Sequence, residues 1–294
     1  MSESALRLLA MDAPLQKQRV TIRLLEPPDS CHNSLWVRLL DGTYDKPFII
    51  DRGVRRFLHF DLDTVQSAMN RRHPDRLSLT YTRKMMAFLL FNPAPARILL
   101  LGLGGGSLAK FCYQCLPQAT ITAVEVNPDV IALRDAFRVP ADNERFRVIR
   151  AEGAAYVACP SQPKDVILAD ACDSEGVDPG CGTLEFYQHA YRCLSRGGVF
   201  VANLCIEAYG CSAQLRRIRA VFGDHCVTLR VRQHGNVIVL AFKEPGPGIH
   251  WPRLEAAAPA LKQRFGLNFP RFVRRAQEHD AALAGLQMMS WRPH

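Results

Sequence analysis

The sequence predicts an α/β fold in which a small antiparallel β domain precedes a doubly wound, mostly parallel sheet. Three observations support this prediction. From residue 97 onward, short apolar runs alternate with helical segments in four consecutive β-α-β units, which is typical of a parallel sheet covered by helices on both faces. The first of these runs leads directly into a glycine-rich loop. Residues 18–60 hold only short apolar runs broken by turn residues, as in small antiparallel sheets.

In the first quarter of the chain, turn residues separate three predicted strands. Pro27-Pro28 interrupts the pattern once, and Asp41-Gly42 lies between two apolar runs, where such a dipeptide indicates a hairpin. The strands are expected over residues 19–25, 35–40 and 47–50. A helix is expected over 81–90, ending before Asn92-Pro93, because proline disfavours helical conformation in the residue that precedes it.

Strands and helices alternate in the α/β part. The run Ile98-Leu99-Leu100-Leu101 is continuously apolar, as expected for a strand buried on both faces. The strands are expected over residues 98–101, 120–126, 146–150, 165–169 and 199–204, and the helices over 107–115, 128–137, 154–158 and 185–194. Two further strands, 227–232 and 237–242, form a predicted hairpin, and residues 251–294 are predicted to be helical.

These elements divide the chain into four parts. Residues 1–17 are expected to form a flexible N-terminus, and residues 18–78 the small β domain. Residues 79–245 form the expected α/β domain, which holds the candidate site. Residues 246–294 form a C-terminal helical segment that is expected to pack on it.

The composition is that of a globular protein and narrows the range of partners. Apolar residues make up 48% and charged residues 22% of the chain, both ordinary for a folded domain. The sequence lacks the roughly 18 uninterrupted apolar residues of a membrane span and the start of a secretory signal, so we expect a cytoplasmic protein without membrane contacts. The net charge is +9, but the basic residues are dispersed and no aromatic residues interleave with them, which argues against nucleic-acid binding.

Two features of the residue distribution bear on ligands. No lysine or arginine occurs between Lys164 and Arg192, whereas this stretch holds several acidic residues. Such an acidic island in a basic protein suggests a cationic ligand. Cys112 and Cys115 form a lone C-x-x-C without a second pair or a nearby histidine at zinc spacing. Their i, i+3 placement in a predicted helix favours core packing, and no metal is implied.

A nucleoside site is predicted at the carboxyl ends of the first three parallel strands. Glycines 102, 104, 105 and 106 follow the first strand, where they allow a sharp turn and a close approach of the backbone to a ligand. Glu125 ends the second strand, roughly twenty residues after the glycine loop, and an acid there accepts hydrogen bonds from ribose hydroxyls. Glu152-Gly153 follows the third strand, where an acid reaches the exocyclic amine of adenine. These residues do not by themselves separate nicotinamide cofactors from S-adenosyl compounds.

Two carboxylates follow the fourth strand in the stretch Ala169-Asp170-Ala171-Cys172-Asp173. At this spacing both side chains can face the same ligand. Such a pair can hold an ammonium group or take a proton from an amine nucleophile, and a cation nearby keeps both carboxyls ionised.

Several of these stretches together resemble the spermidine synthase family of polyamine aminopropyltransferases: Tyr81-Thr82-Arg83, Gly104-Gly105-Gly106, Val124-Glu125-Val126-Asn127-Pro128, Asp170-Ala171-Cys172-Asp173 and Glu185-Phe186-Tyr187. The resemblance covers about residues 45–245. It implies a class I methyltransferase-like sheet, together with a small N-terminal sheet that ordinary class I methyltransferases lack. It also implies transfer of an aminopropyl group from decarboxylated S-adenosylmethionine to a small di- or polyamine.

The resemblance assigns roles to individual residues. It implies that Asp170 is the base acting on the attacking amine, and that Asp173 helps to bind the same cationic chain. Tyr81 and Arg83 join Asp173 among the expected substrate-binding residues. On the donor side, Glu125 would hold the ribose and Glu152 the adenine, and the remaining cofactor-binding residues would be Gly102, Gly104, Gly105, Gly106, Ser107 and Gly153.

The sequence also departs from the family pattern. The family's glycine loop normally continues with an aspartate that helps to hold the donor's aminopropyl amine, whereas this chain has Ser107. The helix before the first parallel strand has Arg83 where the family tends to have a neutral or acidic residue, and Ser174 replaces the usual proline after Asp173. An arginine can pair with the carboxylate of intact S-adenosylmethionine.

Two alternatives to the leading function therefore remain open. One is a methyltransferase that uses intact S-adenosylmethionine on the same fold, and the other is a non-catalytic nucleoside-binding paralogue. In each case no cofactor is expected to be tightly bound: decarboxylated or intact S-adenosylmethionine would be a co-substrate. The expected partner is a small cationic amine. The oligomeric state is left open, with a homodimer as one candidate.

Overall fold

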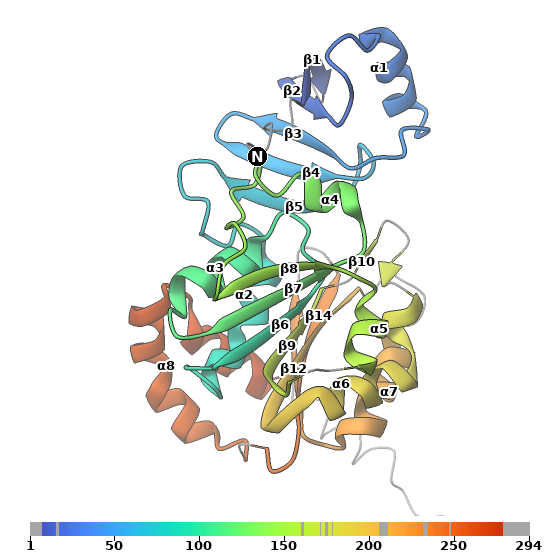
Figure 1. Cartoon of the computed structure of the whole chain (residues 1–294). Helices are drawn as coiled ribbons and strands as arrows, with labels where there is room; N and C mark the ends of the chain where they lie inside the picture. Colours follow the sequence, from blue (N-terminus) through green and yellow to red (C-terminus); the bar gives the residue numbers. More distant parts are fainter. Residues whose placement is uncertain are drawn as a thin grey trace, which may run out of the picture.

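The computed structural model contains two principal sheets, with helices on both faces of the larger one (Figure 1). It describes residues 8–15, 18–159, 162–170, 172–173, 176–177, 179–205, 211–231, 235–246 and 248–278. The N-terminal sheet has five strands and the larger sheet has seven. The predicted fold class, a mostly parallel doubly wound sheet with a small N-terminal antiparallel sheet, is confirmed.

The N-terminal sheet is a meander in which each strand pairs antiparallel with the next, in the order β1 (Leu9–Leu15), β2 (Gln18–Leu24), β3 (Phe48–Arg52), β4 (Arg55–His59) and β5 (Val65–Asn70). Alternate residues of its strands, such as Ile22 and Ile50, face one apolar core, as the two-residue period of a strand requires. The sequence predicts a flexible segment over residues 1–17, but residues 9–15 form β1. Leu9 and Met11 are buried there and β1 pairs along its whole length with β2.

The strand predicted over residues 35–40 is wrong, because these residues belong to helix α1 (His32–Leu40). Leu35 and Leu39 are buried, whereas Val37 and Leu40 are exposed, which is the four-residue spacing of a helix face rather than the alternation of a strand. Asp41 is the C-cap, so the Asp-Gly dipeptide ends a helix instead of forming a hairpin. Gly42 takes the positive φ of 76° that is common just after a helix.

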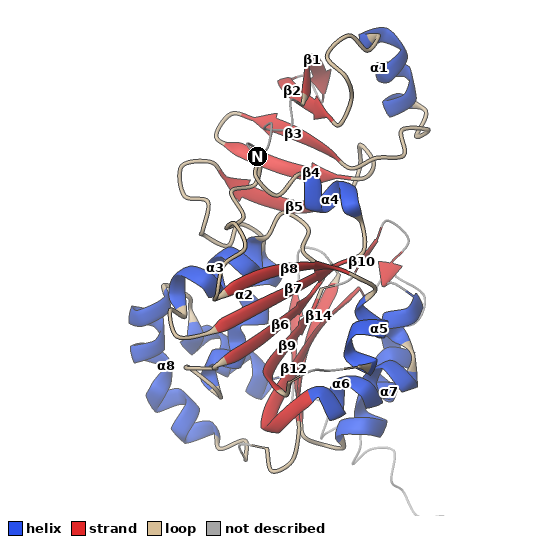
Figure 2. Ribbon diagram, in the orientation of Figure 1, coloured by secondary structure: helices blue, strands red, loops and turns tan. Residues whose placement is uncertain are grey.

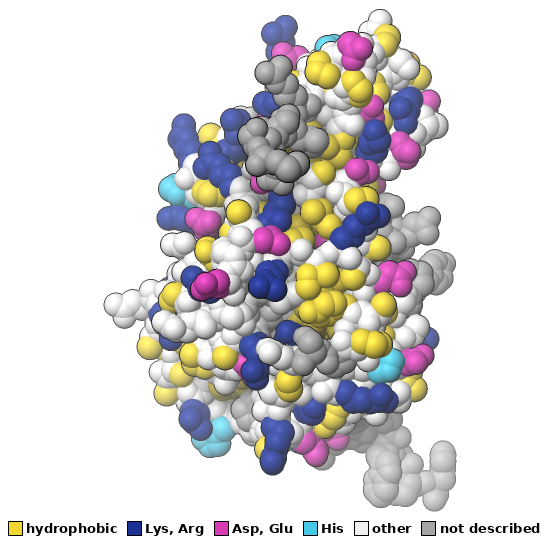
Figure 3. All heavy atoms as spheres, in the orientation of Figure 1, with side chains coloured by type: hydrophobic (Ala, Val, Ile, Leu, Met, Phe, Trp, Pro, Cys, Tyr) yellow, Lys and Arg dark blue, Asp and Glu magenta, His cyan; other side chains and the backbone are white. Residues whose placement is uncertain are grey.

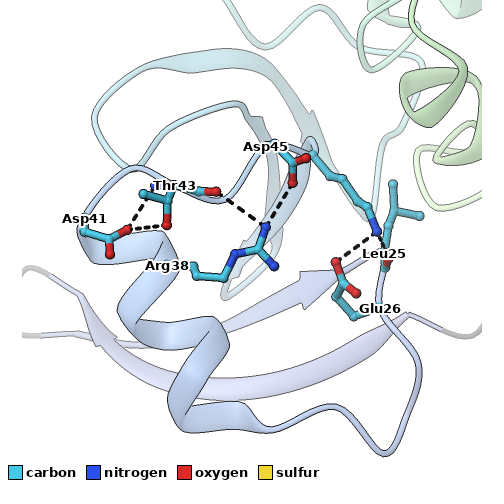
Figure 4. A network of polar contacts seen from close by, with 7 residues as sticks. Leu25, Glu26, Arg38, Asp41, Thr43 and Asp45 are labelled. Carbon is cyan, nitrogen blue, oxygen red and sulfur yellow. Dashed lines mark hydrogen bonds and ion pairs between the residues drawn. The ribbon is translucent and has the colours of Figure 1, made fainter.

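Polar contacts fix the chain that follows α1 (Figure 4). The Asp41 carboxylate accepts hydrogen bonds from the backbone N–H and the hydroxyl of Thr43, at 3.0 and 2.7 Å. Arg38 pairs with Asp45 at 3.0 Å, and Lys46 pairs with Glu26 at 3.0 Å. Arg38 thereby joins the helix to the loop before β3, and Lys46 joins that loop to the segment after β2.

The larger sheet has the strand order β13-β14-β12-β9-β6-β7-β8. Its five parallel strands are β6 (Arg97–Leu101), β7 (Thr120–Glu125), β8 (Phe146–Arg150), β9 (Lys164–Ala169) and β12 (Leu194–Cys205). The hairpin β13 (Cys226–Val231) and β14 (Asn236–Phe242) adds an antiparallel edge next to β12. Chain order reverses direction at β6, between β7 and β9, and ligands of doubly wound sheets bind beyond the carboxyl ends of the strands at this switch point.

Helices cover the two faces of the larger sheet (Figure 2). One face packs against α2 (Thr80–Met85), the 3-10 turn η1 (Met86–Leu90), α3 (Ser107–Cys115) and α8 (Trp251–Phe265). The other face packs against α5 (Gly153–Ala158), α6 (Leu184–Cys193) and α7 (Cys211–Phe222). Between β9 and α6 lie the short hairpin β10 (Cys172–Asp173) with β11 (Gly176–Val177) and the turn η2 (Pro179–Gly182). None of the helices in the described ranges has the length and apolarity that a membrane crossing needs.

The helix predicted over residues 128–137 is shorter than expected. Helix α4 (Pro128–Ala132) ends early, and turns follow to Arg138, whose φ is 56°. The carbonyls of Ala136 and Phe137 accept hydrogen bonds from the Arg56 and Lys110 side chains, both at 2.6 Å, so they are satisfied without a continuing helix. At the C-terminal end, Gly266 stops α8 with a φ of 69°, and residues 269–278 are helical again. The rest of the predicted C-terminal helical segment lies outside the described residues.

Candidate functional site

The glycine loop between β6 and α3 turns the chain at the carboxyl edge of the larger sheet. Gly102, Gly104 and Gly106 have φ values of 94°, 50° and 64°, which residues with a side chain rarely adopt. A Cβ at Gly106 would lie 2.4 Å from Cγ2 of Val139. The Gly102 N–H donates to the carbonyl of Val124 at 2.8 Å. The loop is therefore anchored to β7, and glycine is required at its last position by both conformation and space.

Glu125, at the end of β7, holds the glycine loop from one side. Its Oε2 accepts the Leu103 N–H at 2.9 Å and the Gly104 N–H at 3.5 Å, while its Oε1 accepts the Asn127 N–H at 3.0 Å. Each carboxylate oxygen has two lone pairs, so Oε1, which accepts only one N–H, keeps the capacity to accept a ligand hydroxyl. The side chain is half-buried.

Ser107 begins α3 and faces the N-terminal sheet. Its hydroxyl lies 3.3 Å from the hydroxyl of Ser67, on β5. A Cβ at the preceding Gly105 would lie 2.6 Å from Ser67 Oγ and 2.9 Å from Phe137 Cδ1. The glycine loop therefore packs closely against β5, and the N-terminal sheet is part of the wall of the candidate site.

Glu152 and Gly153 lie at the carboxyl end of β8. Glu152 is the exposed N-cap residue of α5, and Gly153 is the first residue of that helix. A Cβ at Gly153 would come 3.3 Å from Cys181 Sγ. The exposed carboxylate at the strand end is compatible with the predicted contact to an adenine amine, which stays a prediction.

Asp170 follows β9 on the opposite side of the glycine loop from Glu125. Its N–H donates to the carbonyl of Leu101, which places it beside the end of β6. The Asn203 amide donates to Asp170 Oδ1 at 2.9 Å, and the Tyr81 hydroxyl also donates to the carboxylate. Burial raises the pKa of Asp170 above the usual range of an aspartate, and these two hydrogen bonds oppose the rise.

The two residues predicted on the helix before β6 behave differently. Tyr81, in the first turn of α2, reaches Asp170, so the structure brings it to the predicted base. Arg83 donates to Thr80 Oγ1 at 3.1 Å, within the same helix. Because residues two apart point to different sides of a helix, Arg83 is directed away from the Tyr81 side.

The predicted Asp173 lies in β10, where its backbone pairs with Gly176. Its side chain lies outside the described residues, as do several other members of the acidic island. The placement of Asp173 beside Asp170 therefore stays a prediction.

The sequence analysis missed two asparagines of this site, Asn203 on β12 and Asn236 on β14. Asn236 donates to Asn203 Oδ1 at 2.9 Å, and Asn203 in turn donates to Asp170. The signal was present in the sequence: one face of β12 is apolar at Val199 and Val201 and becomes polar at Asn203. An amide that ends an apolar row at the ligand edge of a sheet indicates a polar contact in the site.

Cys112, in the C-x-x-C motif, lies on α3 and is fully buried in the core, and Cys115, the last residue of this helix, is half-buried. Both are free thiols, and burial raises the pKa of each. This agrees with the predicted packing role. On the face drawn in Figure 3, lysine and arginine side chains are spread over both sheets instead of forming one stripe.

The strand order and the acids flanking a glycine loop define a doubly wound α/β protein of the methyltransferase-like class. Within this class, the spermine/spermidine synthase domain matches residues 79–228. The chain is similar to a polyamine aminopropyltransferase of Chromobacterium violaceum, with 38% identity over 238 residues that cover 81% of this chain and 91% of that protein. The chain belongs to the spermine/spermidine synthase family, and these homologues support aminopropyl transfer as its reaction.

Solved structures show the same fold. Human methyltransferase-like protein 13 in complex with SAH has a TM-score of 0.58 and 26% identity, covering 64% of this chain and 92% of that chain. A probable spermidine synthase from Corynebacterium glutamicum has a TM-score of 0.58 and 21% identity, covering 67% of this chain and 77% of that chain. The larger sheet is therefore shared with both spermidine synthases and methyltransferases.

Proposed function

We propose that this protein transfers an aminopropyl group from decarboxylated S-adenosylmethionine to a small di- or polyamine. The main support from the site is Asp170, a carboxylate held by Tyr81 and Asn203 beside the glycine loop. Family membership supports the same reaction.

The proposed reaction is an in-line displacement at carbon. The nitrogen lone pair of the amine attacks the methylene carbon next to the sulfonium. The carbon–sulfur bond breaks, its electron pair goes to sulfur, and methylthioadenosine leaves. The attacking nitrogen loses one proton, which Asp170 takes. An aliphatic amine is almost wholly protonated at neutral pH, so a carboxylate whose pKa is raised is a better base for it than an ordinary aspartate.

The donor would lie across the glycine loop, between Glu125 on one side and Asp170 on the other. Glu125 would accept hydrogen bonds from the ribose hydroxyls, and Glu152 from the adenine amine. Asp173 and Tyr81 would hold the cationic chain of the acceptor. We further expect the enzyme to act in the cytoplasm and regard a homodimer as one candidate assembly.

Product analysis tests the proposal. The purified chain is incubated with decarboxylated S-adenosylmethionine and a series of linear diamines and spermidine, and mass spectrometry detects methylthioadenosine together with an aminopropylated amine. The same reactions with intact S-adenosylmethionine serve as a comparison. Equimolar formation of methylthioadenosine and the extended amine is expected. Binding of the decarboxylated donor without turnover with any amine, or methyl transfer from the intact donor, would contradict the proposal.

A further inference from the structure

A row of amides runs from the antiparallel edge of the sheet to Asp170. Asn236, the first residue of β14, donates through Nδ2 to Asn203 Oδ1 at 2.9 Å. Asn203, on β12, donates through Nδ2 to Asp170 Oδ1, also at 2.9 Å. Three neighbouring elements of the sheet, β14, β12 and the end of β9, are thus connected through side chains at one edge.

The strand register explains why these side chains meet. Asn203 lies opposite Ile238 and Cys205 lies opposite Asn236 in the antiparallel pair of β12 and β14, so Asn236 is the diagonal neighbour of Asn203 on one face. On the other side of β12, Ala202 pairs with Ala169. Asn203 on β12 and Asp170, which follows β9, come directly after this pair and therefore lie side by side.

The same face of both strands is otherwise apolar. Val199 and Val201 precede Asn203 on β12, and Ile238, Leu240 and Phe242 follow Asn236 on β14, all in one core. Asn203 is 5% exposed. Amides replace apolar residues only where the face reaches the carboxyl edge that holds the candidate site, so core packing alone does not account for them.

We propose that Asn236 is a positioning residue, which fixes the orientation of the Asn203 amide so that its N–H₂ group, not its carbonyl, faces Asp170. This inference rests on the proposed function of Asp170 as the base. An amide donates from one end and accepts at the other, so the bond from Asn236 to the carbonyl end commits the opposite end to donate. Without Asn236, Asn203 can rotate and present its oxygen to the carboxylate.

The orientation of the Asn203 amide controls the ionised form of Asp170. Among the described residues, the groups that face the carboxylate are Asn203 from β12 and the Tyr81 hydroxyl from α2. Both donate and thereby favour the ionised carboxylate, against the effect of burial. An Asn203 carbonyl in place of the N–H₂ group would require a protonated Asp170 to donate to it.

The variants Asn236→Asp and Asn236→Leu separate this role from packing. A carboxylate at 236 only accepts, so it draws the Asn203 N–H₂ group toward itself and turns the Asn203 oxygen toward Asp170. Leucine at 236 removes the hydrogen bond to Asn203 Oδ1 but does not attract the Asn203 N–H₂ group. Thr228→Val is the matched control, because Thr228 is a buried polar residue of the same hairpin. It lies opposite Val239, which packs in the core on the other face of the sheet.

The first measurement does not depend on activity. In protein with ¹³C-labelled aspartate carboxyls, the Asp170 resonance is assigned by its loss in Asp170→Asn and titrated in each variant. The midpoint should rise by about one pH unit or more in Asn236→Asp, in line with the typical effect of a reversed hydrogen bond to a charged group. It should rise less in Asn236→Leu and not at all in Thr228→Val. A negative charge at 236 also raises the midpoint by repulsion, so the uncharged variant is decisive: an Asp170 midpoint in a folded Asn236→Leu that equals that of the wild type would overturn the inference.

The second measurement connects the asparagines to turnover. The acid limb of the kcat profile should move to higher pH in Asn236→Asp, with kcat at neutral pH about tenfold lower and little change in the KM for the donor. If the Asp170 midpoint rises in Asn236→Leu but the wild type transfers no aminopropyl group, the positioning role of Asn236 stands and the proposed function fails. If the enzyme transfers aminopropyl groups and both the midpoint and the kcat profile are unchanged in Asn236→Asp, the proposed function stands and the positioning role of Asn236 fails.

Discussion

The Oε2 atom of Glu125 accepts the backbone N–H of Leu103 at 2.9 Å, so the acid expected to hold the ribose also holds the glycine loop. This double role changes how a mutation at this position must be designed. Removing the carboxylate would remove the expected ligand contact and, at the same time, a hydrogen bond that holds the glycine loop.

Glu125→Ala should weaken binding of methylthioadenosine by about tenfold to a hundredfold, because a hydrogen bond to a charged group contributes about 1.5–3 kcal/mol. Glu125→Gln keeps one carbonyl oxygen for the Leu103 N–H, but its N–H₂ group cannot accept the Asn127 N–H and the charge is lost. It should therefore lose less stability than the alanine variant, which loses all of these acceptors, and both variants should bind more weakly than the wild type. Calorimetry and thermal unfolding measure the two effects. Unchanged affinity in a folded alanine variant would remove Glu125 from the site.

The second prediction concerns the choice of donor. Ser107 replaces the aspartate expected to hold the aminopropyl amine, and its hydroxyl instead faces Ser67. The double variant Ser107→Asp with Arg83→Gln should shift the ratio of affinities toward decarboxylated S-adenosylmethionine, because a carboxylate pairs with its amine and repels the carboxylate of the intact donor. Binding of both donors is compared by calorimetry. If the wild type already prefers the decarboxylated donor strongly, the two replaced residues do not set the preference.

The single variant Arg83→Gln shows how much each of the two replaced residues contributes to the shift in donor preference. Arg83 donates to Thr80 on its own helix, so we expect this single change to contribute little and Ser107→Asp to carry most of the shift. A dominant effect of Arg83→Gln would mean that the guanidinium leaves Thr80 when the donor binds.

Gly106→Ala should destabilise the protein more than a change of conformation alone explains. An alanine at a φ of 64° is strained, at a cost of about 1–2 kcal/mol, and its Cβ would also lie 2.4 Å from Val139. Gly42 is the matched control, because its φ is 76° and a Cβ there meets nothing within 4 Å. Chemical unfolding should show a clearly larger loss for Gly106→Ala than for Gly42→Ala. Equal losses would mean that the loop gives way to Val139 freely.

The parallel sheet was predictable from the sequence because most of its strands contain a short apolar run bounded by a turn or a helix start. The strand predicted over residues 98–101 is β6, which begins one residue earlier, and the helix predicted over 107–115 is α3. The N-terminal sheet was less predictable. The run at 35–40 is apolar at nearly every position, so its period could not distinguish a helix from a strand, and burial of Leu35 and Leu39 decides it.

The candidate site was predicted where a residue ends a strand or follows it directly. Glu125 ends β7 and Asp170 follows β9, and the order of the strands brings them to the two sides of the glycine loop. The two amides could not be placed in the same way. Asn203 and Asn236 are distant in the chain and meet through the antiparallel register of β12 and β14, which a sequence of this kind does not specify.

Because of Lys110, the free energy of unfolding should increase at alkaline pH. Lys110 is 1% exposed and donates to the Phe137 carbonyl, and burial lowers its pKa to about 8 from an unfolded value of 10.5. Between these two pH values the unfolded chain binds more protons than the folded one, so the free energy of unfolding increases with pH. The cost of the buried charge is present below pH 8 and is relieved above it.

Lys110→Met has no such charge. The wild type should therefore gain on the order of 2 kcal/mol relative to Lys110→Met between pH 7 and pH 10, measured by chemical unfolding of both proteins at each pH. A difference between the two proteins that does not change with pH would show that Lys110 stays charged in the fold without penalty over this range.

Asp170→Asn is the most direct test of the reaction. The change keeps the size of the side chain, and the carbonyl of the introduced amide can still accept from Asn203, but the charge and the basicity are lost. Because burial raises the pKa of Asp170, the ionised carboxylate is disfavoured in the fold, so Asp170→Asn should be at least as stable as the wild type at neutral pH. Loss of activity in this variant would then not come from unfolding.

Turnover in Asp170→Asn should fall by about a hundredfold to ten-thousandfold, the usual effect of losing a general base, while methylthioadenosine should bind as before, because the proposed role of Asp170 is toward the acceptor. In the wild type, kcat should decline as pH falls through the raised pKa of Asp170, since only the ionised carboxylate takes the proton, and this limb should be absent from the residual activity of the variant. Rates with donor titration are measured for Asp170→Asn and Asp173→Asn. Near wild-type turnover in Asp170→Asn would defeat the proposed mechanism, and a larger loss in Asp173→Asn would assign the base to Asp173.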